Sequence, residues 1–174
     1  MSKLFSIALF IFSGYIVSIY SLSVPDIDNN NISFNNYRGK KILIVNTATG
    51  NAQANQQFTQ LQQLYQQYQD SLVIIAFPSN SFGNEPGTNA EIKSVMQGTY
   101  NVTFPIALKS LVKGDSANRV YQWLGDKMQN DVMDGKIKRD FQKYLIDRSG
   151  YIVAKFDSSV SPISSTVLNA INNY

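Results

Sequence analysis

The stretch SLVIIAFPSNSFGNEPGTN, from Ser71 to Asn89, decides the fold. Its first part, Ser71 to Phe77, is a continuous apolar run with β-branched residues, and such a run predicts a strand that is buried on both faces of a sheet. The next eleven residues hold two prolines and two glycines, which favour a long turn. Asn89 can then cap a following helix. A buried strand, a turn and a helix in this order indicate an α/β domain.

The chain on both sides of this stretch continues the alternation of strands and helices. Lys40 to Asn46 is a second short apolar run and predicts another buried strand. An amphipathic helix lies between the two strands, because apolar residues recur there at helical spacing (Phe58, Leu61, Leu64, Tyr65 and Tyr68). A turn or short hairpin is expected over 26–36, helices over 117–124 and 161–174, and a hairpin from 137–147 and 151–157. The sequence therefore predicts a central mixed sheet with helices on both faces.

Composition excludes several kinds of protein. The 174 residues suit one domain, and a net charge of +3 is too small to indicate nucleic-acid binding. The chain contains neither cysteine nor histidine, so zinc sites, iron–sulfur sites, disulfides and histidine-based catalysis are excluded. No loop has calcium-binding spacing, and we expect no metal and no cofactor. The basic side chains near the C-terminal hairpin, Lys143 among them, are interpreted as a solvated strand edge.

The N-terminus differs from the rest of the chain. Lys3 precedes an apolar run from Leu4 to about Tyr20, and small residues follow at Ser21 and Ser23. This pattern predicts a secretory signal peptide over residues 1–23, cut near Ser23, with one domain over 24–174. The alternative is an uncleaved membrane anchor, because Leu4 to Leu22 is long enough to span a bilayer.

Several motifs, in one order, resemble the glutathione peroxidases. Asn46-Thr47-Ala48-Thr49 is similar to the family's Asn-Val-Ala-Ser, and residues 77–89 resemble its Phe-Pro-Cys-Asn-Gln-Phe-Gly and Glu-Pro-Gly-Thr-Asn signatures. The segments 102–105 and 137–150 follow in register. The resemblance covers essentially the whole chain from Val24 onward. It implies a thioredoxin-like fold and a peroxidase whose nucleophile is a cysteine or selenocysteine thiolate.

The four positions of the family's active-site tetrad are all occupied by other residues here. The resemblance places Asn51 at the position of the nucleophile, Ser81 at that of the glutamine, and Arg139 and Asp140 at those of the tryptophan and the asparagine. An amide is not a nucleophile, and a serine would need a strong base beside it. Asn51, Ser81 and Asp140 are expected to form either a polar pocket at the strand ends or an ordinary solvated loop cluster.

Three functions follow from this sequence. The main prediction is an exported family member, periplasmic or secreted, that has lost peroxidase chemistry and binds a protein or small ligand as a monomer. The second is a peroxidase that reduces hydrogen peroxide or lipid hydroperoxides in oxidative stress, with glutathione or thioredoxin as its reductant. The third is a structural envelope protein held at a membrane by its N-terminal segment. Because the chain has no thiol, enzymatic inactivity is the expectation at this point.

Overall fold

A four-stranded mixed sheet forms the centre of the protein. The computed structural model describes residues 16–174, so the predicted signal peptide lies largely outside the described residues. The strands are β3 (Lys41–Thr47), β4 (Leu72–Pro78), β5 (Lys143–Ile146) and β6 (Ile152–Phe156), in the order β4-β3-β5-β6. β3 and β4 are parallel, whereas β5 pairs antiparallel with both β3 and β6. The mixed sheet that the sequence predicts is thus confirmed.

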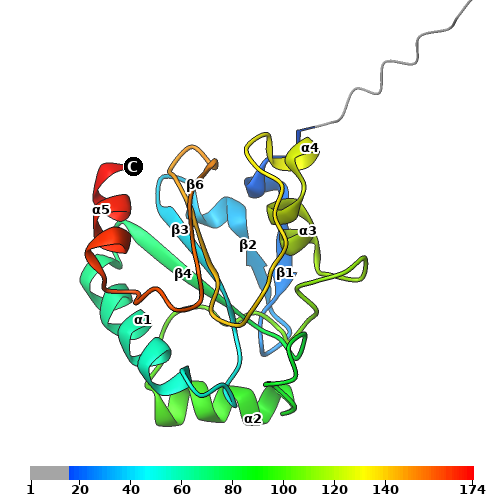
Figure 1. The fold of residues 1–174 in the computed structure, drawn as a ribbon, viewed down its shortest axis with the longest axis vertical. Coiled ribbons are helices and arrows are strands. Elements are labelled where there is room, and N and C mark those ends of the chain that lie inside the picture. Colours follow the sequence, from blue (N-terminus) through cyan, green and yellow to red (C-terminus); the bar gives the residue numbers. More distant parts are fainter. Residues whose placement is uncertain (1–15) are drawn as a thin grey trace, which may run out of the picture.

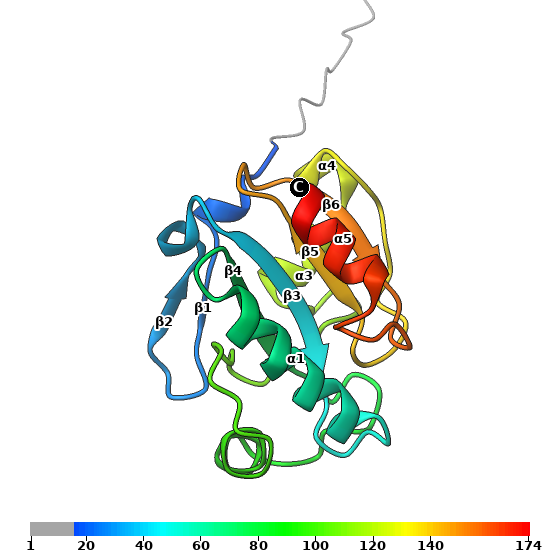
Figure 2. The same ribbon diagram turned by 90° about the vertical axis from the view of Figure 1, so that its left-hand side faces the viewer.

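The two apolar runs of the sequence form the buried strands β3 and β4. Every residue of β3 and of β4 is buried, because both faces of the sheet are covered. The helices are α1 (Ala54–Tyr68), α2 (Asn89–Lys93), α3 (Arg119–Gly125), α4 (Lys127–Asn130) and α5 (Ser165–Asn173), and a π-helical turn (Ser94–Thr99) extends α2. Figures 1 and 2 show α1 and α5 on one face of the sheet and α3 on the other. Two apolar cores result, one on each face.

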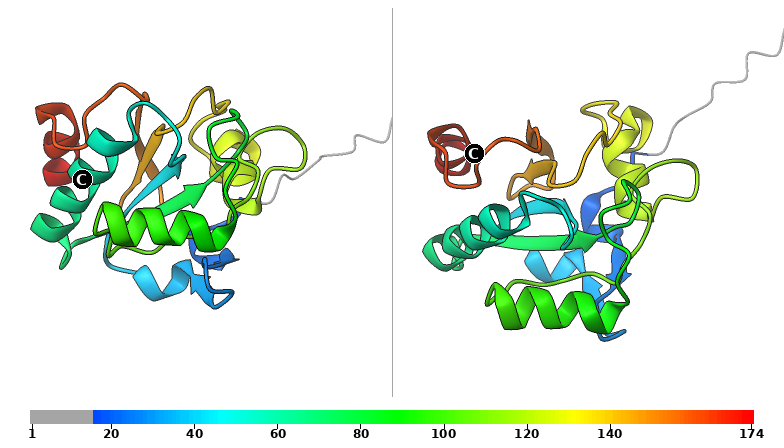
Figure 3. Two further views of the ribbon diagram at one scale, coloured as in Figure 1. Left: turned by 90° about the horizontal axis from the view of Figure 1, so that it is seen from below. Right: turned by 60° about the horizontal axis from the view of Figure 1, so that its bottom comes forward.

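Each core takes alternate residues of the same strand. Ile42 and Ile44 of β3 belong to the core under α3, and Leu43 and Val45 belong to the core under α1 and α5. This alternation is the two-residue period of a strand. Phe58, on the predicted stripe of α1, is fully buried and packs edge-on against Phe141 with ring centroids 5.3 Å apart. The layers are seen from two further directions in Figure 3.

Three local predictions are wrong in detail. The cap of α2 is Thr88 rather than Asn89, because the Thr88 hydroxyl and the Glu91 carboxylate form a reciprocal capping box. The first strand of the hairpin begins at Lys143, not at residue 137. Lys143 is also fully buried rather than solvated, because β5 is an inner strand of the sheet.

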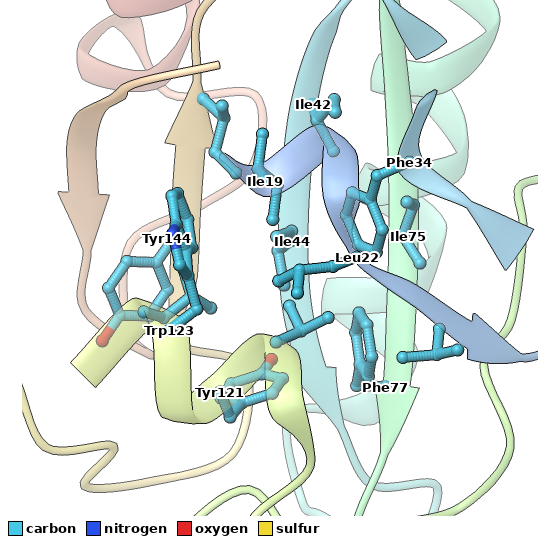
Figure 4. Packing of buried hydrophobic residues seen from close by; sticks show 14 of the residues in the cluster. Ile19, Leu22, Phe34, Ile42, Ile44, Ile75, Phe77, Tyr121, Trp123 and Tyr144 are labelled. Carbon is cyan, nitrogen blue, oxygen red and sulfur yellow. The ribbon is translucent and has the colours of Figure 1, made fainter. Parts of the chain in front are cut away.

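The folded domain begins before residue 24, where the sequence places its boundary. A 3-10 turn (Ile19–Ser21) and strand β1 (Ser23–Pro25) belong to the packed structure, and β1 pairs with β2 (Asn31–Ser33) in a short hairpin. Ile19 and Leu22 are buried in the core under α3, as Figure 4 shows. Among residues 16–174, no helix combines the length and the apolar character needed to cross a membrane.

Candidate functional site

The residues at the tetrad positions come from loops that meet at one end of the sheet. Asn51 lies in the loop after β3, Ser81 in the loop after β4, and Asp140 just before β5. Two hydrogen bonds hold the last segment against the end of β3: the Phe141 N–H donates to the Asn46 carbonyl (2.7 Å), and the Asn46 amide donates to the Arg139 carbonyl (3.0 Å). The carboxyl ends of β3 and β4 lie here, as is typical of ligand sites in open α/β sheets.

A buried carboxylate is the centre of this region. The Asp140 side chain is 2% exposed, and its Oδ2 atom accepts hydrogen bonds from the Asn51 amide (3.0 Å) and the Asn84 amide (2.7 Å). The other oxygen, Oδ1, is buried and has no hydrogen-bond partner among residues 16–174. A buried carboxylate without full hydrogen bonding is unfavourable, so the unused hydrogen-bonding capacity of Oδ1 is a feature that needs an explanation.

A second buried carboxylate fixes the loop that carries Asn51. Glu85 is 1% exposed and accepts two hydrogen bonds from Thr49, one from its backbone N–H (2.5 Å) and one from its hydroxyl (2.7 Å). The Gly50 N–H also donates to the Asn84 carbonyl at 3.0 Å. A Cβ atom at Gly50 would lie 2.7 Å from that carbonyl oxygen, so the close approach of the two loops requires glycine.

The structure brings together only two of the four tetrad positions. Asn51 and Asp140 are hydrogen-bonded, as described above. The Ser81 hydroxyl instead bonds to the Ser79 hydroxyl (2.9 Å) and accepts from the Val112 N–H (3.1 Å). The side chain of Arg139 is exposed, whereas Asp140 is buried, so the carboxylate is not paired with the neighbouring guanidinium.

Sequence reasoning missed two members of the site. Asn84 supplies the shorter hydrogen bond to Asp140, and Asn46 anchors the segment that carries Asp140. Both residues belong to motifs that the resemblance already covers, Asn46-Thr47-Ala48-Thr49 and residues 77–89. Membership of these motifs was the signal that could have pointed to Asn46 and Asn84. The motifs do not show, however, that Asn84 bonds to Asp140, which lies 56 residues away along the chain.

Beside this cluster, Thr49, Gly50 and Glu85 line a cavity of about 250 Å³. A cavity of about 880 Å³ lies between the α3–α4 region and the segment 112–117, and none of the four tetrad positions lines it. Arg139 lines a smaller cavity of about 220 Å³ together with Gln142 and Asp157. In the described part of the chain, no group of three or more acidic side chains is placed to hold a metal ion. We take the Asp140 cluster as the candidate site because it lies at the tetrad positions and contains a carboxylate oxygen, Oδ1, without a hydrogen-bond partner among residues 16–174.

Comparison with known proteins identifies relatives over nearly all of the chain. The family model described as glutathione peroxidase matches residues 19–125. The chain is 39% identical over 145 residues to the glutathione peroxidase-like peroxiredoxin gpx1 of Schizosaccharomyces pombe, covering 82% of this chain and 90% of that protein. It is 40% identical over 158 residues to the glutathione peroxidase-like peroxiredoxin GPX5 of Chlamydomonas reinhardtii, with 87% and 96% covered.

Solved structures agree with the fold. The crystal structure described as Trgpx in apo form superimposes with a TM-score of 0.68 at 30% identity, covering 90% of this chain and 96% of that one. A thiol:disulfide interchange protein of the thioredoxin family from Chlorobium tepidum has a TM-score of 0.64 at 16% identity, with 91% and 96% covered. The second likeness concerns the fold alone, and it confirms the thioredoxin-like arrangement.

These findings correct the main functional prediction. The sequence led us to expect an exported, inactive member of the family, but the relatives are named as peroxiredoxins and as phospholipid hydroperoxide glutathione peroxidases, and they support peroxidase function instead. The prediction rested on the absence of cysteine from this chain, and the names of the relatives overturn it. The match over residues 19–125 and the identity of 39–40% to these relatives show that the chain belongs to the glutathione peroxidase family.

Proposed function

We propose that the protein is a peroxidase that reduces hydroperoxides with a thiol supplied by a second molecule. The names of its relatives support the class of reaction, since both peroxiredoxins and phospholipid hydroperoxide glutathione peroxidases are among them. The observation that carries the proposal is the unpartnered Oδ1 atom of Asp140, beside the position at which the family has its nucleophile.

The nucleophile has to come from outside the chain. Breaking the O–O bond of a peroxide requires a soft nucleophile, and the thiolate is the form of sulfur that provides it. The 174 residues include no cysteine, and Asn51 is an amide. Glutathione and the dithiol of a thioredoxin are two external thiols of this kind, and they would approach the chain at Asn51, which is partly exposed.

Asp140 is the residue that can move the proton. As the sulfur of the external thiol attacks the terminal oxygen of the peroxide, which carries the hydrogen, Oδ1 accepts the S–H proton, and the O–O bond breaks. The departing alkoxide, or hydroxide in the case of hydrogen peroxide, then takes that proton and leaves as an alcohol or as water, while the thiol becomes a sulfenic acid. A second thiol condenses with the sulfenic acid to give a disulfide and water. Asn51 and Asn84 hold Oδ2 throughout, which keeps Oδ1 free to accept.

A peroxide-consumption assay tests this proposal. Purified full-length protein is mixed with hydrogen peroxide or a lipid hydroperoxide, first with glutathione and its reductase and then with thioredoxin and its reductase. We expect multiple turnovers above the buffer blank with at least one reductant. Asp140→Asn should lower the rate by about 10²-fold, because positioned acid–base groups contribute about 10²–10⁴-fold.

The matched control is Asp70→Asn, which removes a carboxylate that is exposed at the end of α1. Its rate should equal that of the unmodified protein. Turnover no faster than the blank with both reductants refutes the proposal. Equal rates for Asp140→Asn and Asp70→Asn would leave a peroxidase but remove Asp140 from its mechanism.

The predicted compartment is part of the proposal. Lys3 and the apolar run that follows it support export to a periplasm or to the outside of the cell. In such a compartment the reductant has to be a thiol that is available there. Fractionation of the native host, with the protein detected by antibody, tests the location independently of activity.

A further inference from the structure

The first described residues are tied into the fold by hydrogen bonds. The Val17 N–H donates to the Gln129 carbonyl at 2.8 Å, and the Val17 carbonyl accepts from the Trp123 indole N–H at 2.6 Å. Trp123 itself is 1% exposed. Without Val17 the indole N–H would lose its acceptor in a buried position, which is unfavourable.

Side chains of the next residues belong to the core. Ile19 is fully buried, Tyr20 is 5% exposed and Leu22 is 7% exposed. Figure 4 shows Ile19 and Leu22 against Ile42 and Ile44 of the central strand β3. Three large apolar side chains contribute a considerable part of the stability of a domain of this size, because the margin of stability is small.

Tyr20 is held from three sides. Its hydroxyl donates to the Arg148 carbonyl at 2.7 Å, and the Arg38 guanidinium lies 4.1 Å from the centre of its ring. Gly150 has a φ of +94°, and a Cβ atom there would lie 2.8 Å from the Tyr20 ring. The β5–β6 turn is therefore shaped around a residue that lies inside the predicted signal peptide.

From these contacts we infer that the export signal ends before Val17, so that the mature protein keeps Val17 to Ser23. A cut near Ser23 would remove Ile19, Tyr20 and Leu22 from the core. The family model begins at residue 19, which agrees with this boundary. The apolar stretch Leu4 to Phe12 has nine residues, within the 7–15 typical of a signal peptide, and the small residues Ser13 and Gly14 follow it.

The same boundary shortens the apolar run that precedes the domain. Once Val17 and the residues after it are part of the domain, the apolar run is limited to the 13 residues from Leu4 to Ile16. A helix that spans a bilayer typically has about 20 apolar residues.

Mass spectrometry of the protein from its native host gives the direct test. The expected N-terminal residue lies between Ser13 and Val17. A mature N-terminus at Ser23 or Val24, or a chain that keeps Met1, would each overturn the inference.

Two truncated chains test the physical reason. The chain 16–174 should keep the cooperative thermal unfolding and the tryptophan emission of the full-length protein, and Trp123 is a clean reporter because it is the only tryptophan. The chain 24–174 should show red-shifted emission and no cooperative transition. If both truncated chains unfold at the same temperature as the full-length protein, the argument is wrong.

Point variants of the full-length protein cover the case in which a truncated chain does not accumulate. Tyr20→Ala should lower the unfolding temperature clearly, because the side chain is buried and its hydroxyl is hydrogen-bonded. Ser21→Ala, next to it but exposed, is the matched control and should not change it. Equal unfolding temperatures for the two variants would show that this segment does not contribute to the core.

Discussion

Lys143 should make the stability of the protein depend on pH. It lies on the inner strand β5 and is fully buried. Its amine donates to the carbonyls of Phe141 (2.8 Å) and Val160 (2.9 Å), and no carboxylate in residues 16–174 is within ion-pair distance of it. Burial lowers the pKa of Lys143 from 10.5 to about 7. The change that isolates this effect is Lys143→Met, which keeps an unbranched side chain and removes the amine.

The sign follows from proton linkage. In the unfolded chain the amine has its ordinary pKa of about 10.4, so between pH 7 and pH 10 the unfolded chain binds more protons than the folded one. Stability therefore rises with pH in this window and falls as the pH approaches 7. The difference between the two pKa values corresponds to about 5 kcal/mol in full, of which about 3–4 kcal/mol is expressed between pH 7 and pH 10.

Urea unfolding at pH 7, 8, 9 and 10 measures this dependence. Lys143→Met should lose about 3–4 kcal/mol of the rise that the unmodified protein shows over this range. Tyrosines with raised pKa values, such as Tyr144 at about 12, also contribute to the pH dependence of stability. Their contribution cancels in the comparison, because both proteins contain the same tyrosines. Lys138→Met, at an exposed position, is the control and should keep the full rise. If Lys143→Met and the unmodified protein have the same pH profile, the buried amine does not titrate as described. The absolute stability at one pH is not decisive, because the methionine also leaves two carbonyls without a donor.

Three further changes test the site and the fold. Glu85→Ala should lower the free energy of unfolding by about 1–3 kcal/mol in urea, because two donors of the Asn51 loop lose their acceptor; an unchanged value would contradict the buried contact. Asn51→Cys should give a thiol whose pKa is above the usual value of about 8.5, because the Asp140 carboxylate lies beside it, and a lower pKa from the pH dependence of thiol alkylation would be evidence against this. Gly150→Ala should lower the unfolding temperature and the free energy of unfolding by about 1–3 kcal/mol, because φ there is +94° and the added Cβ atom would lie 2.8 Å from the Tyr20 ring. Thermal denaturation followed by circular dichroism measures this, and an unchanged unfolding temperature would contradict the prediction.

Local patterns were sufficient for the main elements of the fold. The apolar runs at Lys40–Asn46 and Ser71–Phe77 and the stripe on α1 correspond to β3, β4 and α1. Such segments are readable because burial on both faces or on one helical face leaves a period in the sequence. The packing of Ile19 and Leu22 in the core under α3 was not readable from the sequence. A signal peptide and a buried terminal segment are both apolar, so composition does not separate Leu4 to Phe12 from Ile19 to Leu22.

The sequence by itself determined that the chain has an α/β fold and that it carries no thiol, because the first is a matter of local periodicity and the second of composition. Only the tertiary structure decided that Asp140 is buried between Asn51 and Asn84, that Ser81 bonds elsewhere, and that Lys143 has no contact with water. The partners of Asp140 lie 89 and 56 residues away along the chain. Contacts at such separations depend on how strands are ordered and how loops close over their ends, and that information is carried by the packing of the whole domain rather than by any one segment.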